Sequence, residues 1–231
     1  MSGVLRVLVG FETSGRTRRA FADLGHDAWS CDLLPAVDDS NHHIRGDVFD
    51  VLDDGWDLGI FHPTCTYLTI SAEWAYGDGP YHQKVKPGTL VGQARREARD
   101  KAVADFIRLD TCAIPMRAIE NPIGCISSRH RKPDQVIQPY QFGDDASKAT
   151  CLWLHGLPKL EIDPARRCAG RMVEWNGKTV ERWGNQTDSG QNRLPPSADR
   201  WSKRSATYAG IAAAFAAQWG RPSNDLFGRA A

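Results

Sequence analysis

The sequence predicts an α/β fold, with a parallel sheet, helices on both faces and a small C-terminal lobe. Short apolar runs alternate with amphipathic stretches in the N-terminal part, which is the pattern of strands connected by helices. The 231 residues are 41% hydrophobic and 25% charged, which is typical of one globular domain. Basic and acidic residues number 29 and 28, so the net charge of +1 gives no general argument for binding nucleic acid.

Each element is expected from its local pattern. Strands are expected where short apolar runs stop at glycine, proline or an acidic residue. Helices are expected where apolar residues recur every three or four positions. The expected strands are 4–9, 28–31, 56–61, 116–119 and 151–154, and the expected helices are 16–24, 94–109 and 203–219.

The helices are expected to bury their apolar residues. In the helix over 16–24, these are Ala20, Phe21 and Leu24. Glycines and prolines in 77–92 predict a long loop instead of a helix or strand. In the helix over 94–109, the expected inward residues are Ala94, Ala98, Ala102, Phe106 and Leu109.

The composition changes after residue 157, where Pro, Gly, Asn, Arg and Trp become frequent. This change predicts a separate small lobe over 158–202. An alanine-rich helix over 203–220 then returns to the main domain, which spans 1–157, and 221–231 form a tail.

Targeting and metal-binding signals are weak. The N-terminus lacks the pattern of a secretory signal, and no apolar run approaches the roughly 20 residues of a membrane span. The six cysteines are widely spaced with no Cys-x-x-Cys pair, so we expect reduced thiols in a cytoplasmic protein and no metal site.

Polar residues follow several of the expected strands. In parallel sheets, ligands bind beyond the carboxyl ends of the strands, so these residues are candidates for a shared site. These candidates are 11–15, Asp32, Gly46 with Asp47, 62–65 and 120–122. The ordinary alternatives are a strand-to-helix turn for 11–15 and turn caps for the acidic residues.

Cys65 and Glu120 are the most specific pair of candidate catalytic residues. A cysteine that follows a proline at a strand end can form a reactive thiolate, and a carboxylic acid can donate a proton nearby. Together they suit covalent addition to an electron-poor ring. The alternatives are a buried structural Cys65 and a Glu120 that caps a turn.

The ordered motifs resemble the cytosine-5 DNA methyltransferase family, and more closely its short phage-encoded members. That family has a cofactor turn starting with phenylalanine, two acidic positions, a Pro-Cys turn and a Glu-Asn turn, in this order. The residues that carry the resemblance are Phe11 to Gly15, Asp32, Gly46-Asp47, Pro63-Thr64-Cys65, Glu120-Asn121-Pro122, the segment 142–154 with Ser147-Lys148-Ala149-Thr150, and 207–211 with Gln218-Trp219-Gly220.

The resemblance implies a Rossmann-like S-adenosylmethionine-dependent methyltransferase sheet. Phe11 would stack near the adenine, Asp32 would bind the ribose and Asp47 the adenine amino group. Residues 1–157 would form the catalytic and cofactor-binding domain, 158–202 the recognition lobe, and 203–220 the helix that completes the cofactor site. The other implied cofactor residues are Ser14, Gly15, Pro63 and Tyr208.

The resemblance also implies a mechanism on cytosine in DNA. Cys65 would add to ring carbon 6, and Glu120 would hold and protonate ring nitrogen 3, so that carbon 5 accepts the methyl group. Lys148 would stand where the family has an arginine. In duplex DNA the base must first be flipped out of the helix, and the loop over 66–92 would close over it as a lid.

Several departures leave alternatives open. Thr64 replaces a second proline and Thr150 replaces a second arginine, which motivates a non-catalytic nucleic-acid-binding relative. The short lobe motivates the same chemistry on a free nucleotide or RNA. We expect a monomer or weak dimer, in a bacterial host cell if phage-encoded, that binds duplex or single-stranded DNA.

Basic clusters with nearby tryptophans are the expected phosphate and base contacts. The tryptophans are Trp175 and Trp183. The clusters are Arg16, Arg18 and Arg19; Arg95, Arg96, Arg99 and Lys101; Arg129, Arg131 and Lys132; Arg166, Arg167 and Arg171; and Arg200, Lys203 and Arg204.

Overall fold

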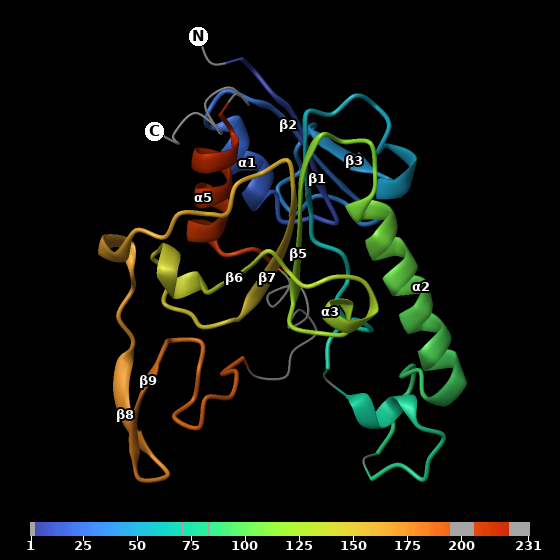
Figure 1. Cartoon of the computed structure of the whole chain (residues 1–231), viewed down its shortest axis with the longest axis vertical. Helices are drawn as coiled ribbons and strands as arrows, with labels where there is room; N and C mark the ends of the chain where they lie inside the picture. Colours follow the sequence, from blue (N-terminus) through green and yellow to red (C-terminus); the bar gives the residue numbers. More distant parts are fainter. Residues whose placement is uncertain (1–2, 71, 83, 195–205, 222–231) are drawn as a thin grey trace.

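The computed structural model, which describes residues 3–70, 72–82, 84–194 and 206–221, has an α/β fold. A seven-stranded sheet in the order β3-β2-β1-β4-β5-β7-β6 is flanked by helices, and a two-stranded hairpin stands apart (Figure 1). The strands are β1 Arg6–Gly10, β2 Asp27–Asp32, β3 His43–Arg45, β4 Leu58–Phe61, β5 Met116–Pro122, β6 Gln135–Ile137 and β7 Thr150–His155.

The sheet is mixed, whereas the sequence predicted a parallel one. Strands β1 to β5 are parallel, but β7 lies antiparallel between β5 and β6. The connection 138–149 between β6 and β7 contains a short 3-10 helix and no crossover α-helix. Antiparallel neighbours need only such a short connection, which accounts for the reversed strand.

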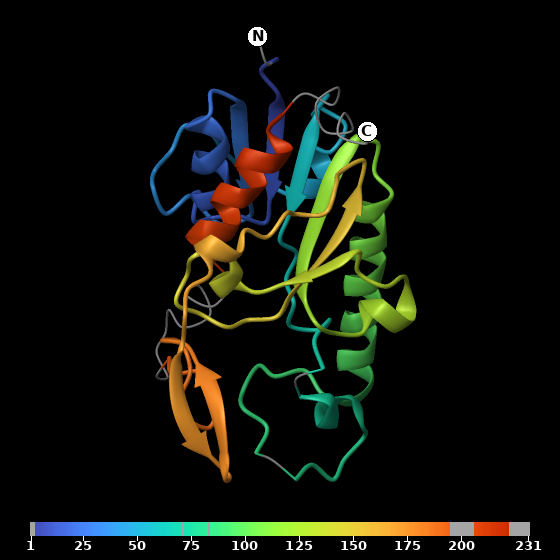
Figure 2. The same cartoon turned by 60° about the vertical axis from the view of Figure 1, so that its left-hand side comes forward.

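Helices cover both faces of the sheet (Figure 2). On one face lie α1, Arg16–Ala22, and α5, Ala209–Trp219, whose Phe21, Phe215 and Trp219 are fully buried with the strands. On the other face lie α2, Gly92–Asp110, and α3, Ile126–Arg129. The predicted two-sided arrangement is therefore confirmed.

The strand order reverses between β1 and β4. From β1 the chain proceeds outward to β2 and β3, and it then returns to the other side of β1 with β4. In doubly wound sheets this switch point opens a crevice beyond the carboxyl ends of the two strands. The turns that follow β1 and β4 therefore face a natural binding place.

Three helix predictions differ in detail from the structure. Leu24 lies beyond the end of α1 and is 56% exposed. In α2, Ala94 is exposed, while Arg95 and Arg99 are buried because aromatic rings and main-chain oxygens receive them. The final helix begins at Ala209 instead of at Lys203, which lies outside the described residues.

The lobe contains a hairpin that the sequence analysis missed. Strands β8, Arg171–Trp175, and β9, Lys178–Arg182, are joined by Asn176 and Gly177, both with positive φ. Asn-Gly between two strands is a strong hairpin signal, so the sequence did carry it. The hairpin and the segment 72–82 project from the same end of the sheet (Figure 1).

No described helix combines the length and apolar character needed to cross a membrane.

Candidate functional site

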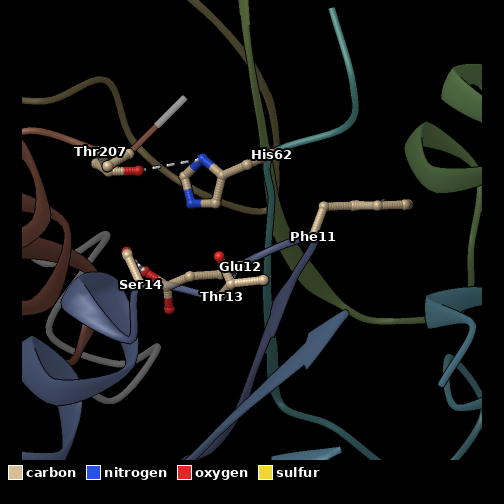
Figure 3. A pocket seen from close by; sticks show the side chains of 7 residues that line it. Phe11, Glu12, Thr13, Ser14, His62 and Thr207 are labelled. Atoms are coloured by element: carbon tan, nitrogen blue, oxygen red, sulfur yellow. Dashed lines mark hydrogen bonds between the residues drawn. The ribbon is translucent and has the colours of Figure 1, made fainter. Parts of the chain in front are cut away.

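An open hollow of about 360 Å³ lies at the switch point of the sheet (Figure 3). Three segments far apart in the sequence line it: the turn after β1, the turn after β4 and the approach to α5. Its lining residues are Phe11, Glu12, Thr13, Ser14, His62, Ala206 and Thr207.

The turn after β1 depends on residues with positive φ. Phe11 has φ 60°, and its amide donates to the Cys31 carbonyl at 2.7 Å, which joins the ends of β1 and β2. Gly15 has φ 63°, and a Cβ there would lie 2.5 Å from Oδ2 of Asp38. The predicted site residues Phe11, Ser14 and Gly15 thus belong to one tightly folded turn.

Glu12 caps α1, a role that the sequence analysis missed. Its buried carboxylate accepts the amides of Thr17 at 2.8 Å and Arg18 at 3.1 Å, and the Ser14 hydroxyl at 3.2 Å. An internal carboxylate therefore occupies the positive end of the helix, where phosphate groups commonly bind. This hollow suits a ligand that places no phosphate at α1.

Asp32 and Asp47 do not line the hollow; they lie around the Cys31 thiol, next to the turn after β1. Burial and the negative charges of Asp32, Asp47 and Asp50 raise the pKa of Cys31 to about 11. Phe11 contacts Phe49 edge-on, with ring centroids 6.1 Å apart. The sequence-predicted residues Phe11, Asp32 and Asp47 are thus brought to the same side of the sheet edge.

Both carboxylates also make local hydrogen bonds. Asp32 accepts the amide of Leu34 at 2.9 Å, and Asp47 accepts that of Phe49 at 3.0 Å. The turn-cap interpretation is therefore correct for each of them. A carboxylate has lone pairs left after one such bond, so capping does not prevent ligand binding.

His62 connects the switch-point hollow to Glu120. Its Nδ1 lies 3.1 Å from Oε2 of Glu120 and 3.5 Å from the Thr207 hydroxyl. The His62 side chain is only 6% exposed, and its buried Nε2 has no hydrogen-bond partner within the described part of the chain. The sequence places His62 in this turn but carries no signal for its contacts with Glu120 and Thr207.

Glu120 lies within β5, and it does not cap a turn. Burial would raise the pKa of Glu120, but the positive charge of Lys148 and the hydrogen bond from His62 hold it below its usual value. Glu120 is therefore a buried carboxylate. Lys148 comes close because β7 is antiparallel, so that its beginning lies beside the end of β5.

A second, smaller hollow of about 190 Å³ adjoins Glu120. Thr207 lines both hollows, so they are neighbours. Tyr208, a predicted cofactor residue, lies in this second hollow, and its hydroxyl accepts from Asn185 at 3.4 Å. The residues lining it are Glu120, Lys148, Thr150, Thr207, Tyr208 and Ile211.

Cys65 is exposed, which overturns the alternative of a buried structural cysteine. The side chain of Asn121 donates to the Pro63 carbonyl at 2.8 Å. A second tie follows, from the Cys125 amide to the Leu68 carbonyl, also 2.8 Å. The turn that carries Cys65 is therefore fastened to the strand that carries Glu120.

Arginines of α2 hold the segment that follows Cys65. Arg99 donates to the carbonyls of Tyr67 at 3.0 Å and Thr69 at 3.4 Å, and it pairs with Glu73 at 2.6 Å. Its guanidinium lies 3.4 Å from the ring centroid of Tyr76. The first part of the expected lid is therefore held against α2. Because Arg99 makes these contacts within the protein, it is not a phosphate ligand on an open surface.

Most other predicted phosphate contacts are engaged within the protein. Trp183 is buried and stacks on Tyr140 with centroids 4.1 Å apart, so it is not available to a base, whereas Trp175 is 42% exposed. Arg200, Lys203 and Arg204 lie outside the described residues. The ion pairs are Arg18 and Arg19 with Asp38, Arg96 with Asp78, Lys101 with Asp105, Arg129 with Asp100, Arg131 with Asp110 and Asp134, Arg167 with Glu181, and Arg171 with Asp188.

In the described part of the chain, no group of three or more His, Cys, Asp or Glu side chains could hold a metal ion.

No protein-family model matches the sequence, and no curated protein matches it either. The case for a function therefore depends on the motifs and on the geometry of the two hollows.

Proposed function

We propose that the protein is an S-adenosylmethionine-dependent methyltransferase that acts on carbon 5 of cytosine in DNA through a covalent cysteine adduct. One observation carries this proposal: the exposed Cys65 turn is fastened to β5 beside the buried carboxylate of Glu120, through the bond from Asn121 to Pro63. The turn that carries the nucleophile and the strand that carries the carboxyl group thus meet at one edge of the sheet, which supports covalent addition to a pyrimidine.

The position of the switch-point hollow supports the proposed cofactor. It lies where ligands bind in doubly wound sheets, and it is lined by His62, whose buried Nε2 has no hydrogen-bond partner among the described residues. Glu12 fills the phosphate position at α1, which favours a phosphate-free cofactor over a dinucleotide. The strand order, with an antiparallel strand between β5 and β6, agrees with the Rossmann-like methyltransferase sheet that the resemblance implies.

When bound, S-adenosylmethionine supplies an electrophilic methyl group. Phe11, Asp32 and Asp47 would hold its adenosine on the flank next to Cys31. Ser14 and Gly15 would approach it from the turn after β1, and Pro63 from the turn after β4. Tyr208 would contribute through the neighbouring hollow beside Thr207.

The chain's own residues would carry the pyrimidine chemistry. The Cys65 thiolate forms a bond to ring carbon 6, and the displaced electron pair makes carbon 5 nucleophilic. Glu120 and ring nitrogen 3 share one proton; because Glu120 is a carboxylate, this proton is taken up when the base binds. After carbon 5 gains the methyl group, a base removes its proton and the thiolate leaves, which restores Cys65 and the aromatic ring.

A second substrate class is favoured by one observation. The basic side chains expected to hold phosphates are largely paired with carboxylates among the described residues. This leaves less unpaired positive charge for a long phosphate backbone. The same chemistry on a free deoxycytidine nucleotide, or on RNA, is therefore the second candidate.

The test combines a comparison of substrates with the trapping of the covalent cysteine adduct. Labelled methyl incorporation into duplex DNA, single-stranded DNA, RNA and dCMP identifies the substrate. DNA that contains 5-fluorocytosine should form a covalent adduct with wild type and Cys112→Ala, and none with Cys65→Ala. Methyl transfer by Cys65→Ala at the wild-type rate would overturn the mechanism. No binding of S-adenosylmethionine in calorimetry would favour a non-catalytic nucleic-acid-binding protein.

A further inference from the structure

His62 lies between the two hollows and contacts a group in each. Its Nδ1 is 3.1 Å from Glu120, which lines the smaller hollow. The ring itself lines the switch-point hollow. A single buried side chain therefore joins the proposed cofactor site to the proposed base site.

The hydrogen-bonding capacity of His62 is only partly used. Nε2 is buried and has no partner among the residues that the structure describes, while buried polar atoms in proteins are nearly always satisfied. Figure 3 shows this nitrogen on the side of the ring that faces Glu12, Thr13 and Ser14, away from the bond to Thr207. A partner for Nε2 would have to approach from this side of the ring.

The bond to Glu120 determines what Nε2 can do. A carboxylate only accepts hydrogen bonds, so Nδ1 must carry the proton that it shares with Glu120. In the neutral ring, Nε2 then presents a lone pair to the hollow. A ligand that donates an N–H to this point satisfies His62 without disturbing Glu120.

The walls of the hollow separate a polar part from an aromatic part. Thr13 and Ser14 lie below the imidazole, and the Thr207 hydroxyl lies beside its Nδ1. Phe11 lies on the other side and contacts Phe49. The aromatic side suits a purine ring, and the polar side suits an ammonium and carboxylate pair.

We propose that His62 contacts the cofactor and positions Glu120 at the same time. Nε2 accepts a hydrogen bond from the α-ammonium group of the methionyl moiety of S-adenosylmethionine, and Nδ1–H fixes the Glu120 carboxylate. This inference rests on the proposed function. It follows that filling the polar end of the hollow also orders the carboxylate that receives the cytosine ring.

Two conservative variants test the roles of the two ring nitrogens separately. In His62→Asn the amide nitrogen can replace Nδ1 and keep the bond to Glu120, but nothing reaches the position of Nε2. In His62→Gln the longer side chain can place its oxygen near the position of Nε2, while the bond to Glu120 is lost. The two probes are S-adenosylhomocysteine, which carries the amino-acid moiety, and 5′-methylthioadenosine, which lacks it.

Calorimetry should show that His62→Asn binds S-adenosylhomocysteine about tenfold more weakly than wild type, the effect of one hydrogen bond to a charged group. Its affinity for 5′-methylthioadenosine should not change. His62→Gln should bind S-adenosylhomocysteine within about twofold of wild type, yet lose kcat, because Glu120 is no longer fixed.

The outcomes separate this inference from the proposed function. If wild type binds neither probe, the methyltransferase proposal fails and this inference fails with it. If wild type binds and His62→Asn binds equally well, or weakens toward both probes alike, only the contact inferred for His62 is overturned.

A measurement on the wild-type protein guards against variants that do not fold. In ¹⁵N spectra, the Nε2 resonance of His62, assigned by its absence from His62→Gln or by connectivity, should shift with S-adenosylhomocysteine and not with 5′-methylthioadenosine. Equal shifts with both probes, or none with either, would overturn the inference.

Discussion

Asn121 donates its side-chain amide to the main-chain oxygen of Pro63 at 2.8 Å, across the ends of β5 and β4. Asn121 is 2% exposed and follows Glu120, while Pro63 precedes the Cys65 turn. This buried hydrogen bond therefore helps to set the spacing between the two groups proposed to act on the pyrimidine ring, together with the pairing of β4 with β5.

Replacing Asn121 should affect activity more than stability. Asn121→Ala removes one buried hydrogen bond, so the free energy of unfolding should fall by about 1 kcal/mol. Methyl transfer should fall by roughly a hundredfold, since small displacements of reacting groups are costly. Thermal melts and labelled-methyl assays measure both effects, with the exposed Asn41→Ala as control. An unchanged kcat would show that this bond does not position Cys65.

The cysteines should differ sharply in reactivity. Burial and nearby carboxylates raise the pKa of Cys31, and likewise that of Cys151, to about 11. Thiols with so high a pKa react slowly near pH 8, whereas Cys65 is exposed. Iodoacetamide labelling followed by mass spectrometry should modify Cys65 first, and Cys65→Ser should lose that fastest label. Earlier labelling of Cys31 or Cys151 would contradict this order.

Arg99 should restrain the segment after the Cys65 turn. Arg99→Ala removes the bonds to the Tyr67 and Thr69 carbonyls and the contact with the Tyr76 ring. Amides over 67–76 should then exchange with deuterium faster, because their local opening becomes less costly. Lys101→Ala, on the exposed side of the same helix, is the matched control. Equal exchange in the Arg99 variant would mean that other contacts hold this segment.

Asp110, which lies away from the proposed site, should make the stability of the protein depend on pH. Burial would raise the pKa of Asp110, but hydrogen bonds from Arg131 and His130 hold it below its usual value. A carboxyl with a lowered folded-state pKa stabilises the protein above its unfolded pKa, near 4. This stabilisation is lost as the pH falls through the folded-state pKa.

Asp110→Asn tests this dependence. The variant should be less stable at pH 7 by about 3 kcal/mol, and its unfolding free energy should fall less than that of wild type as the pH falls below about 5. Urea unfolding at several pH values measures both quantities. Parallel curves for the two proteins would exclude Asp110 as the source of acid sensitivity.

The strand ends were predictable because apolar runs stop at polar or flexible residues. Asp32 and the Cys65 turn were correctly expected at the carboxyl edge on this ground. The reversed direction of β7 was not predicted, because the apolar pattern of a buried strand is the same in parallel and in antiparallel pairing. Only its pairing with β5 shows why Lys148 lies near Glu120.

The arginines and the cap were missed for a different reason. Arg95 and Arg99 occupy the buried face of α2, where hydrophobic periodicity assigns charged residues to solvent. Their burial depends on aromatic rings and carbonyl groups supplied by a distant loop. Glu12 likewise caps α1 from outside the helix, so the pattern within the helix contained no signal for it.

The walls of the hollows also have a consequence for biosynthesis. Arg16 donates to the carbonyl of Thr207 across 191 positions, and the approach to α5 lines both hollows. Contacts so distant in the chain form late, because a long loop must close first. A nascent chain on the ribosome can therefore assemble β1 to β5 while both hollows still lack this wall. A ligand that needs this wall would therefore bind only after residues 206–211 have emerged from the exit tunnel.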